Sequence, residues 1–167
     1  MKIEDNFLDQ KEFDKLQFLI LSQNFAWYFN SRIDFKNEIT DRFQFSHYFY
    51  SETVPMSTSF DLLNPIFEII NPISLWRIKA NLLTQTSDII KNQFHVDNGY
   101  LSEEKLKNWT TSIFYVNTNN GYTEFEDGAK VESIANRMVS FPANLKHRGT
   151  SCTDEKTRVV INFNYIK

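Results

Sequence analysis

The sequence predicts a mainly β domain of the α+β class, a jelly-roll sandwich with supporting helices at its N-terminal end. Short stretches that alternate apolar and polar side chains fill residues 75–167, and turn signals separate them, which is typical of antiparallel sandwiches and barrels. Two stretches with apolar side chains at helical intervals precede residue 74. Apolar residues make up 41% of the chain and aromatic residues 16%, which is enough material for a packed core.

A chain of 167 residues has the length of one domain. We therefore expect a single domain over residues 1–167, in which residues 1–74 form mostly helical support and residues 75–167 form the β core. The strands expected in the core are residues 75–83, 93–97, 111–117, 122–127, 130–135, 137–143, 146–150 and 158–165. The turn signals between them are Asn119-Asn120-Gly121, Asp127-Gly128 and Pro142.

Two helices and one strand are expected in the N-terminal part. The first helix is expected over residues 11–30, where one face carries Phe13, Leu16, Leu19, Ile20 and Trp27. The second is expected over residues 60–70, with a cap from Ser59 or Thr58 and a stop at Pro72. Residues 43–50 alternate aromatic and polar side chains as a half-buried strand does. We interpret His47 in that strand as structural, because no partner motif lies near it.

Charge and cysteine content exclude several classes of protein. The formal net charge of −3 gives no basic field, so nucleic acid is a disfavoured partner. The lone Cys152 excludes an internal disulfide framework, and we interpret it as a small, partly buried thiol. The acidic N-terminus lacks the apolar stretch of a signal peptide, and no later segment has the length of a membrane span. We therefore expect a soluble, cytoplasmic protein.

One group of polar residues suggests a metal site. Residues two apart on a strand face the same side, so His95 and Asp97 can converge on one point while Val96 faces away. His147 is the other histidine on an expected strand of the β-rich half and is our candidate for a third ligand. Two histidines and one carboxylate form a facial triad that leaves positions open on iron(II). A His-x-Asp fragment alone is weak support, since an exposed polar pair has the same spacing.

The order of motifs around this fragment resembles a known family. Residues from Arg77 to Tyr165 resemble the double-stranded β-helix of the iron(II)- and 2-oxoglutarate-dependent oxygenases, on their prolyl-hydroxylase-like side. The matching motifs are His95-x-Asp97, the strand of residues 111–117, the hairpin Gly121-x-Thr123-x-Phe125, the turn of residues 128–131, the strand of residues 137–142 before His147-Arg148-Gly149, and the closing strand of residues 158–163. The run of residues 118–133 with the ending of residues 161–165 resembles small oxygenases of marine bacteriophages and their bacterial hosts.

The resemblance implies the roles of several residues. It implies iron(II) on His95, Asp97 and His147, and a co-substrate, 2-oxoglutarate, whose distal carboxylate lies on Arg158 in the closing strand. Tyr115 matches a position whose hydroxyl also reaches that carboxylate, and a core tyrosine is the competing interpretation. Asn81, which shares a strand face with Arg77 and Lys79, is a candidate third contact. Dioxygen is the second co-substrate, and ascorbate is a candidate accessory cofactor.

The implied activity is hydroxylation of an aliphatic carbon in a peptide, with proline first, or in a small molecule such as a free amino acid. Residues 98–109 carry Tyr100 and Trp109 and could line a substrate entrance or form an ordinary connection. The alternative from another class is a catalytically inert jelly-roll binding or structural module, for instance of phage origin. A metalloenzyme of the cupin type is a further alternative. The sequence departs from the family pattern at Tyr122 and Arg137, where relatives usually carry glycine.

Overall fold

The computed structural model describes residues 1–33, 42–97, 99 and 101–167. The larger of two sheets contains β1 (Lys2–Glu4), β2 (Tyr28–Asn30), β3 (Gln44–Ser51), β4 (Val54–Pro55), β5 (Ser74–Thr84), β6 (Thr110–Tyr115), β9 (Arg137–Pro142) and β11 (Thr157–Ile166). The smaller contains β7 (Tyr122–Phe125), β8 (Lys130–Glu132) and β10 (His147–Gly149). The helical segments are α1 (Gln10–Ile20), the 3-10 turn η1 (Phe60–Leu63), α2 (Asn64–Ile70) and α3 (Glu103–Leu106).

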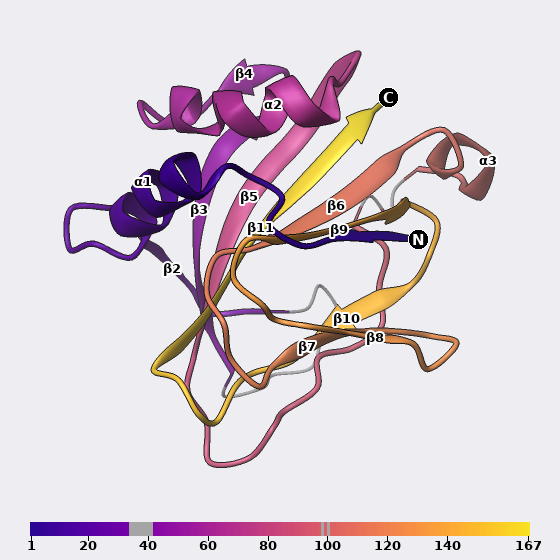
Figure 1. The fold of residues 1–167 in the computed structure, drawn as a ribbon. Coiled ribbons are helices and arrows are strands. Elements are labelled where there is room, and N and C mark those ends of the chain that lie inside the picture. The colour runs from indigo at the N-terminus through magenta and orange to yellow at the C-terminus, as the bar shows by residue number, and fades with distance from the viewer. Residues whose placement is uncertain (34–41, 98, 100) are drawn as a thin grey trace.

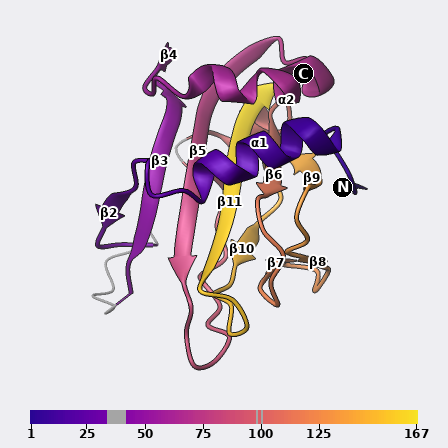
Figure 2. The same cartoon turned by 60° about the vertical axis from the view of Figure 1, so that its left-hand side comes forward.

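The two sheets are antiparallel and face each other, which confirms the expected jelly-roll architecture. The larger sheet has the order β1-β9-β6-β11-β5-β3-β2, with β4 paired to β3, and the smaller has the order β10-β7-β8. Helices α1 and α2 lie over the outer face of the larger sheet, and the smaller sheet lies on its other side (Figures 1 and 2). None of the helices in the described ranges is long and apolar enough to cross a membrane.

Alternation along β11 creates a core on each side of the larger sheet. Val159, Ile161 and Phe163 join the core under α1 and α2, whereas Val160 joins a second core between the sheets. Neighbouring strand residues point to opposite faces, so one strand can serve both layers. The core between the sheets occupies part of this layer, and a cavity lies in the same layer beside it.

The first helix is shorter than the sequence indicates. It begins after Asp9, whose side chain accepts a hydrogen bond from Lys11 N, and it ends at Ile20 instead of continuing to residue 30. The indole Nε1 of Trp27 donates to Ile20 O at 3.3 Å, so Trp27 folds back over the end of the helix. The helical spacing between Ile20 and Trp27 in the sequence therefore arises because the chain turns back and packs Trp27 against the helix. The prediction of a helix through Trp27 is wrong.

The second helical span is correct in its extent, but its cap is not. Residues 60–63 form the 3-10 turn η1 before α2, and the chain leaves α2 at Asn71 with a φ of 46°. Ser59 makes no side-chain cap; its backbone N–H donates to Ser57 Oγ instead. The same hydroxyl contacts His47 Nε2 at 2.8 Å, and His47 Nδ1 lies 2.7 Å from Ala26 O. The structural interpretation of His47 is confirmed, because both of its ring nitrogens have protein partners.

Two other expectations differ from the structure. Strand β1, from the part expected to be mostly helical, pairs with β9 in the larger sheet, whereas the strand expected over residues 43–50 is confirmed as β3, which pairs with β5. Residues 93–97 do not form a strand; isolated bridges at Lys91 and His95 replace a continuous ladder. The connection after Asp97 contains the helix α3, and its Trp109 packs against Trp76 with ring centroids 5.9 Å apart. Tyr100 lies outside the described residues.

Asn136 fixes the N-terminal segment to the larger sheet. It has a φ of 61°, and its buried side chain accepts from Leu8 N at 2.9 Å and donates to Leu8 O at 2.8 Å. We expect Asn136→Ala to lower the free energy of unfolding by about 2 kcal/mol or more, because two buried backbone groups lose their partners. Urea denaturation measures the change. The matched control is Asn6→Ala, at an exposed position with a φ of 51°, and equal losses in both variants would contradict this account.

Candidate metal centre and co-substrate pocket

A cavity of about 740 Å³ lies between the two sheets. Alternate residues of β5 form one wall, the irregular segment of residues 92–97 forms another, and β10 and β11 complete it. Its lining includes these polar and charged residues: Arg77, Lys79, Asn81, His95, Asp97, Thr123, Lys146, His147, Arg158 and Asn162. The sequence-based expectation that Arg77, Lys79 and Asn81 share one strand face is confirmed.

The structure brings His95, Asp97 and His147 together in this cavity. One ligand atom from each residue lies within 4.8 Å of the others. Asp97 Oδ1 lies 3.6 Å from His95 Nε2 and 3.9 Å from His147 Nε2. The side chains of Asp97 and His147 are almost fully buried, whereas 39% of the His95 side chain is exposed. A metal bound here would therefore have protein on one side and open cavity on the other.

Backbone pairing places the two histidines side by side. The N–H of His95 donates to His147 O, and the N–H of His147 donates to His95 O, both at 3.0 Å. The two residues thus form a hydrogen-bonded antiparallel pair, which brings side chains on one face close together. Their ring centroids are 4.8 Å apart. This single pair of bonds does what the expected strand of residues 93–97 was predicted to do.

Each histidine ring is oriented by a carbonyl two residues earlier in the chain. His95 Nδ1 lies 3.1 Å from Gln93 O, and His147 Nδ1 lies 3.2 Å from Leu145 O. A carbonyl only accepts, so each Nδ1 carries the proton and each Nε2 presents its lone pair. Metal-binding histidines commonly use such a contact to fix ring orientation and tautomer. The Nε2 atoms, which face Asp97, are therefore the nitrogens suited to a metal.

Asp97 is held by Asn164 and Arg77, neither of which was expected to contact it. Asn164 Nδ2 donates to Asp97 Oδ2 at 2.9 Å and also contacts Thr111 Oγ1 at 3.1 Å. Arg77 Nη2 lies 3.4 Å from Asp97 Oδ1, and Arg77 Nε donates to the oxygen of Asn164 at 3.2 Å. Asn164 and Arg77 are directly opposite in the pairing of β11 with β5. Their alternation with Asn162 and Lys79 was the available signal, but the sequence did not show which residue Asn164 meets.

The charges of the triad suit a cation. Burial alone raises the pKa of the Asp97 carboxyl, but the neighbouring His95 side chain and the charge of Arg77 hold that pKa well below its ordinary value. Burial lowers the pKa of His147 to about 4, although Asp97 opposes the change. The site therefore offers a carboxylate and a neutral imidazole at neutral pH, the forms in which these groups bind metals.

Arg158 is a buried cation that faces the same cavity. Arg158 is 3% exposed. Its Nε donates to Ser133 Oγ at 2.8 Å, and its Nη2 donates to Thr123 Oγ1 at 3.3 Å. Within the described ranges, no carboxylate lies within ion-pair distance of the guanidinium. Burial lowers the pKa of Arg158, yet a guanidinium keeps its proton in proteins. A buried charge without a counter-charge is costly, so the arrangement favours binding of an anion.

Tyr115 and Gly121 shape the surroundings of Arg158. The Tyr115 hydroxyl donates to Thr123 Oγ1 at 2.8 Å, and the Arg158 guanidinium lies 5.8 Å from the Tyr115 ring centroid. Tyr115 is fully buried behind Thr123, which itself lines the cavity. A Cβ added to Gly121 would lie 2.6 Å from Arg158 Cδ and 2.7 Å from Ser151 O, so only glycine leaves room for this arginine. The sequence marked Gly121 as a turn residue and did not indicate this contact.

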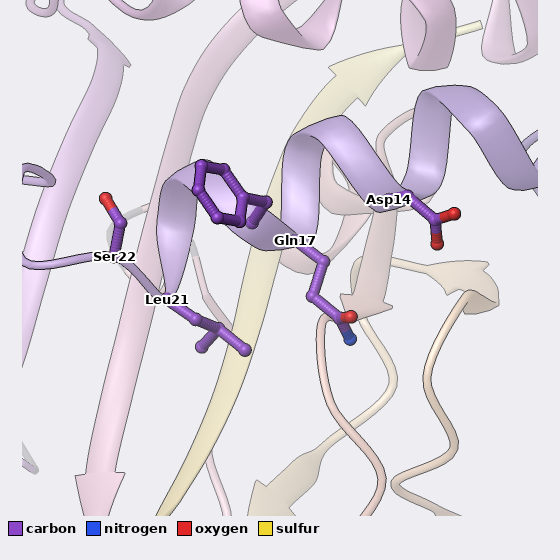
Figure 3. Close-up of a pocket in the computed structure, with 5 residues that line it drawn as sticks. Asp14, Gln17, Leu21 and Ser22 are labelled. Carbon is purple, nitrogen blue, oxygen red and sulfur yellow. The ribbon is translucent and has the colours of Figure 1, made fainter.

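A second hollow, of about 470 Å³, lies on α1 (Figure 3). It is lined by Asp14, Gln17, Phe18, Leu21 and Ser22, on the side of the larger sheet away from the triad. Its one carboxylate, Asp14, already accepts a hydrogen bond from Gln10 at 2.7 Å. Nothing in this hollow suggests a metal ligand set or a charged ligand, and we assign it no role.

Comparisons with known proteins identify the fold. No protein-family model matches the sequence, and no curated protein matches it. A prolyl hydroxylase from Trichoplax adhaerens, solved with a hypoxia inducible factor peptide fragment, is similar with a TM-score of 0.70 at 13% identity, over 99% of this chain and 82% of that one.

Two further prolyl hydroxylases have similar structures. The viral collagen prolyl hydroxylase of Paramecium bursaria Chlorella virus-1 gives a TM-score of 0.57 at 11% identity, over 99% of this chain and 89% of that one. A Pseudomonas putida prolyl-4-hydroxylase gives 0.55 at 11% identity, over 99% and 92%. Structural similarity at such low sequence identity establishes the fold only, so the chemistry must be argued from the residues of the site. The chain therefore has the fold of the prolyl-hydroxylase-like iron(II) and 2-oxoglutarate oxygenases.

Proposed function

We propose that the protein is an iron(II)- and 2-oxoglutarate-dependent dioxygenase that hydroxylates an aliphatic carbon of a peptide or a small molecule. One observation carries the proposal: a single cavity contains both a cluster of two histidines and a carboxylate and a buried arginine without a carboxylate partner in the described residues. A metal-binding protein needs only the first feature. The combination suits a metal and a dicarboxylate bound together.

The triad fits iron(II). Two imidazoles and one carboxylate on one side of a metal are the donor set of non-haem iron oxygenases, and they leave positions for a chelating co-substrate and for dioxygen. His95, Asp97 and His147 would hold the ion through Nε2, a carboxylate oxygen and Nε2. Asn164 and Arg77 would keep the Asp97 carboxylate in place, and the Gln93 and Leu145 carbonyls would orient the rings.

The arginine fits the distal carboxylate of 2-oxoglutarate. A planar guanidinium binds a carboxylate through two parallel hydrogen bonds, which are strong where water is excluded. Arg158 would be this anchor and Thr123 an additional donor. Tyr115 would support both from behind, through its hydroxyl contact with Thr123, in place of the direct contact that the resemblance implied. Asn81 lines the cavity on β5 opposite Val160 and remains a candidate contact to the co-substrate.

When bound, the iron would supply the oxidation chemistry: 2-oxoglutarate and dioxygen would give succinate and carbon dioxide, and one oxygen atom of dioxygen would be placed on the substrate carbon. The protein would supply position and charge. Arg158 would neutralise one co-substrate carboxylate, and the buried walls would keep water from the reacting groups.

The first prediction concerns the metal. His95→Ala, Asp97→Ala and His147→Ala should each lower iron(II) affinity by about 100-fold or more, because removal of a ligand costs more than the 10- to 100-fold typical of a supporting residue. Asn164→Ala should fall in that lower range. Anaerobic competition with a metal-sensitive dye measures the affinities, and Asp14→Ala on α1 is the control. Iron binding that survives His147→Ala unchanged would contradict the triad.

The second prediction concerns Arg158. Arg158→Ala should weaken 2-oxoglutarate binding by an amount on the order of 2–5 kcal/mol, because a desolvated carboxylate loses its counter-charge. Iron affinity should change little, and Arg158→Lys should restore only part of the loss. Calorimetry with the iron-loaded protein measures this, with Arg137→Ala as the control, since Arg137 pairs with the exposed Asp5. An unchanged dissociation constant in Arg158→Ala would remove this arginine from the site.

The third prediction concerns the reaction. With iron(II), 2-oxoglutarate, ascorbate and dioxygen, we expect succinate release together with a mass gain of one oxygen on an accepted substrate. Proline-containing peptides, free amino acids and methylated oligonucleotides are assayed in parallel, with His147→Ala as the inactive control. Product from the oligonucleotides alone would contradict a peptide or small-molecule substrate.

A further inference from the structure

The cavity contains a row of polar side chains that the proposed metal and co-substrate do not use. Lys79 on β5 is directly opposite Asn162 on β11, and both line the cavity. Antiparallel partners on one face have their Cβ atoms about 4.5–5.5 Å apart, so these two side chains are neighbours. On one side of this row lies the pair Arg77 and Asn164, which supports Asp97, and on the other lies Asn81.

Lys79 differs from the other cations of the cavity. Arg77 contacts Asp97 at 3.4 Å, and Lys146 pairs with Glu126 at 3.2 Å. Arg158 is the anchor proposed for 2-oxoglutarate. Lys79 has its ammonium 5.3 Å from the centroid of the Tyr48 ring and no carboxylate within ion-pair distance in the described ranges. Lys79 is therefore a half-buried cation that has no counter-ion in the described ranges. It lies beside Arg77 and Asn164, the pair that supports Asp97.

Asn162 provides a second group without a partner. Its Oδ1 is a buried side-chain oxygen that accepts no hydrogen bond from the described residues. Buried carbonyl oxygens nearly always have a donor, so an unsatisfied one beside a cavity indicates that a ligand supplies it. The row therefore presents one cation and one hydrogen-bond acceptor to the same space.

The charge of the cavity favours a carboxylate or another anionic group on a ligand other than the co-substrate. Four cationic side chains line it, Arg77, Lys79, Lys146 and Arg158, and among the described lining residues Asp97 is the one carboxylate. Iron(II) and 2-oxoglutarate carry +2 and −2 and cancel each other. The loaded cavity thus stays positive in a chain whose net charge is −3. Such a cavity attracts and binds anions.

We infer that Lys79 and Asn162 form the subsite for the head group of the primary substrate, and that this substrate is a free α-amino acid. The α-carboxylate would pair with the Lys79 ammonium, and the α-ammonium would donate to Asn162 Oδ1. An amino acid carries both groups on one carbon, which matches two neighbouring side chains on adjacent strands. An internal residue of a peptide has neither charge. This inference rests on the proposed function and narrows its substrate.

Binding, measured without turnover, tests the inference. The standard free L-amino acids are titrated by calorimetry, without oxygen, into protein loaded with iron(II) and 2-oxoglutarate. For the tightest ligand, Lys79→Met and Asn162→Leu should each weaken binding by about 10- to 100-fold, because each removes a hydrogen bond to a charged group of the ligand. Lys146→Met is the matched control, because it removes a rim cation that already has a partner, and it should bind like the parent.

Derivatives of the same amino acid identify the group that Lys79 binds. The methyl ester should bind the parent as weakly as the acid binds Lys79→Met, and that variant should bind acid and ester alike, as a double-mutant cycle requires. The N-acetyl derivative, which mimics the last residue of a peptide, should bind more weakly because an amide replaces the ammonium. Equal or tighter binding of that derivative would overturn the assignment to a free amino acid.

Two further measurements separate this inference from the proposed function and from damage to the fold. Without ligand, Lys79→Met and Asn162→Leu should unfold at or above the parent's temperature, because each removes a polar atom that has no ion-pair or hydrogen-bond partner among the described residues. All variants should keep the parent's affinity for 2-oxoglutarate.

A parent that binds 2-oxoglutarate but no amino acid, or unchanged amino-acid binding in Lys79→Met, overturns the subsite and leaves the proposed function intact. A loss of 2-oxoglutarate affinity in Lys79→Met also overturns it. Absence of any 2-oxoglutarate binding overturns the proposed function itself.

Discussion

The two candidate metal histidines exchange a reciprocal pair of backbone hydrogen bonds, and the geometry of the cavity depends on that pair. The segment of residues 92–97 has no continuous strand to hold it, so isolated backbone bonds attach it to β10: the pair between His95 and His147, and the bond from Asn92 N to Gly149 O. They align the two imidazoles and bring Asp97 to the point where Asn164 can hold it. With the segment in place, it closes one wall of the cavity, and the polar face of β5 and β11 becomes the floor.

That floor is organised in rows that cross the paired strands. Arg77 and Asn164 support the metal carboxylate, Lys79 and Asn162 form the next row, and Asn81 and Val160 the one after. Arg158 lies on the same face of β11, two residues before Val160. Because strand pairing fixes these rows, one rigid sheet positions both Arg158, the proposed anion site, and the residues Arg77 and Asn164 that support Asp97. Sites on strands are positioned more accurately than sites on loops, as a chelated co-substrate requires.

Sequence periodicity was sufficient for most strands of the β half of the fold, and the order of motifs was sufficient to select the three residues that the structure brings together. Alternation located β5, β6, β9 and β11 closely, because each has one face in a core and its pattern reports burial directly. It failed at Trp27, whose helical spacing arises from a chain that turns back, and at residues 93–97, where a single bridge replaces a strand. Apolar spacing reports which side chains are buried and does not report which backbone path buries them.

The supporting residues of the site could not be predicted for a different reason. Asn164, Ser133 and Gly121 act through partners far away in the sequence, and each contact exists only once the sheets have paired. A polar residue in a strand and a glycine in a turn have ordinary explanations until those neighbours are known. By contrast, the His-x-Asp fragment and Arg158 stand in an order of motifs that the sequence displays directly.

We propose that one cavity binds a metal at the triad and a dicarboxylate at Arg158 as a chelated pair. The most direct measurement is the affinity for 2-oxoglutarate with and without iron(II), under anaerobic conditions, beside the same comparison for glutarate, which lacks the oxo group. Because coupling between two ligands is reciprocal, each should tighten the binding of the other. The account predicts that iron(II) strengthens 2-oxoglutarate binding and leaves glutarate binding much less changed. Equal affinity for 2-oxoglutarate in the presence and absence of the metal would contradict it.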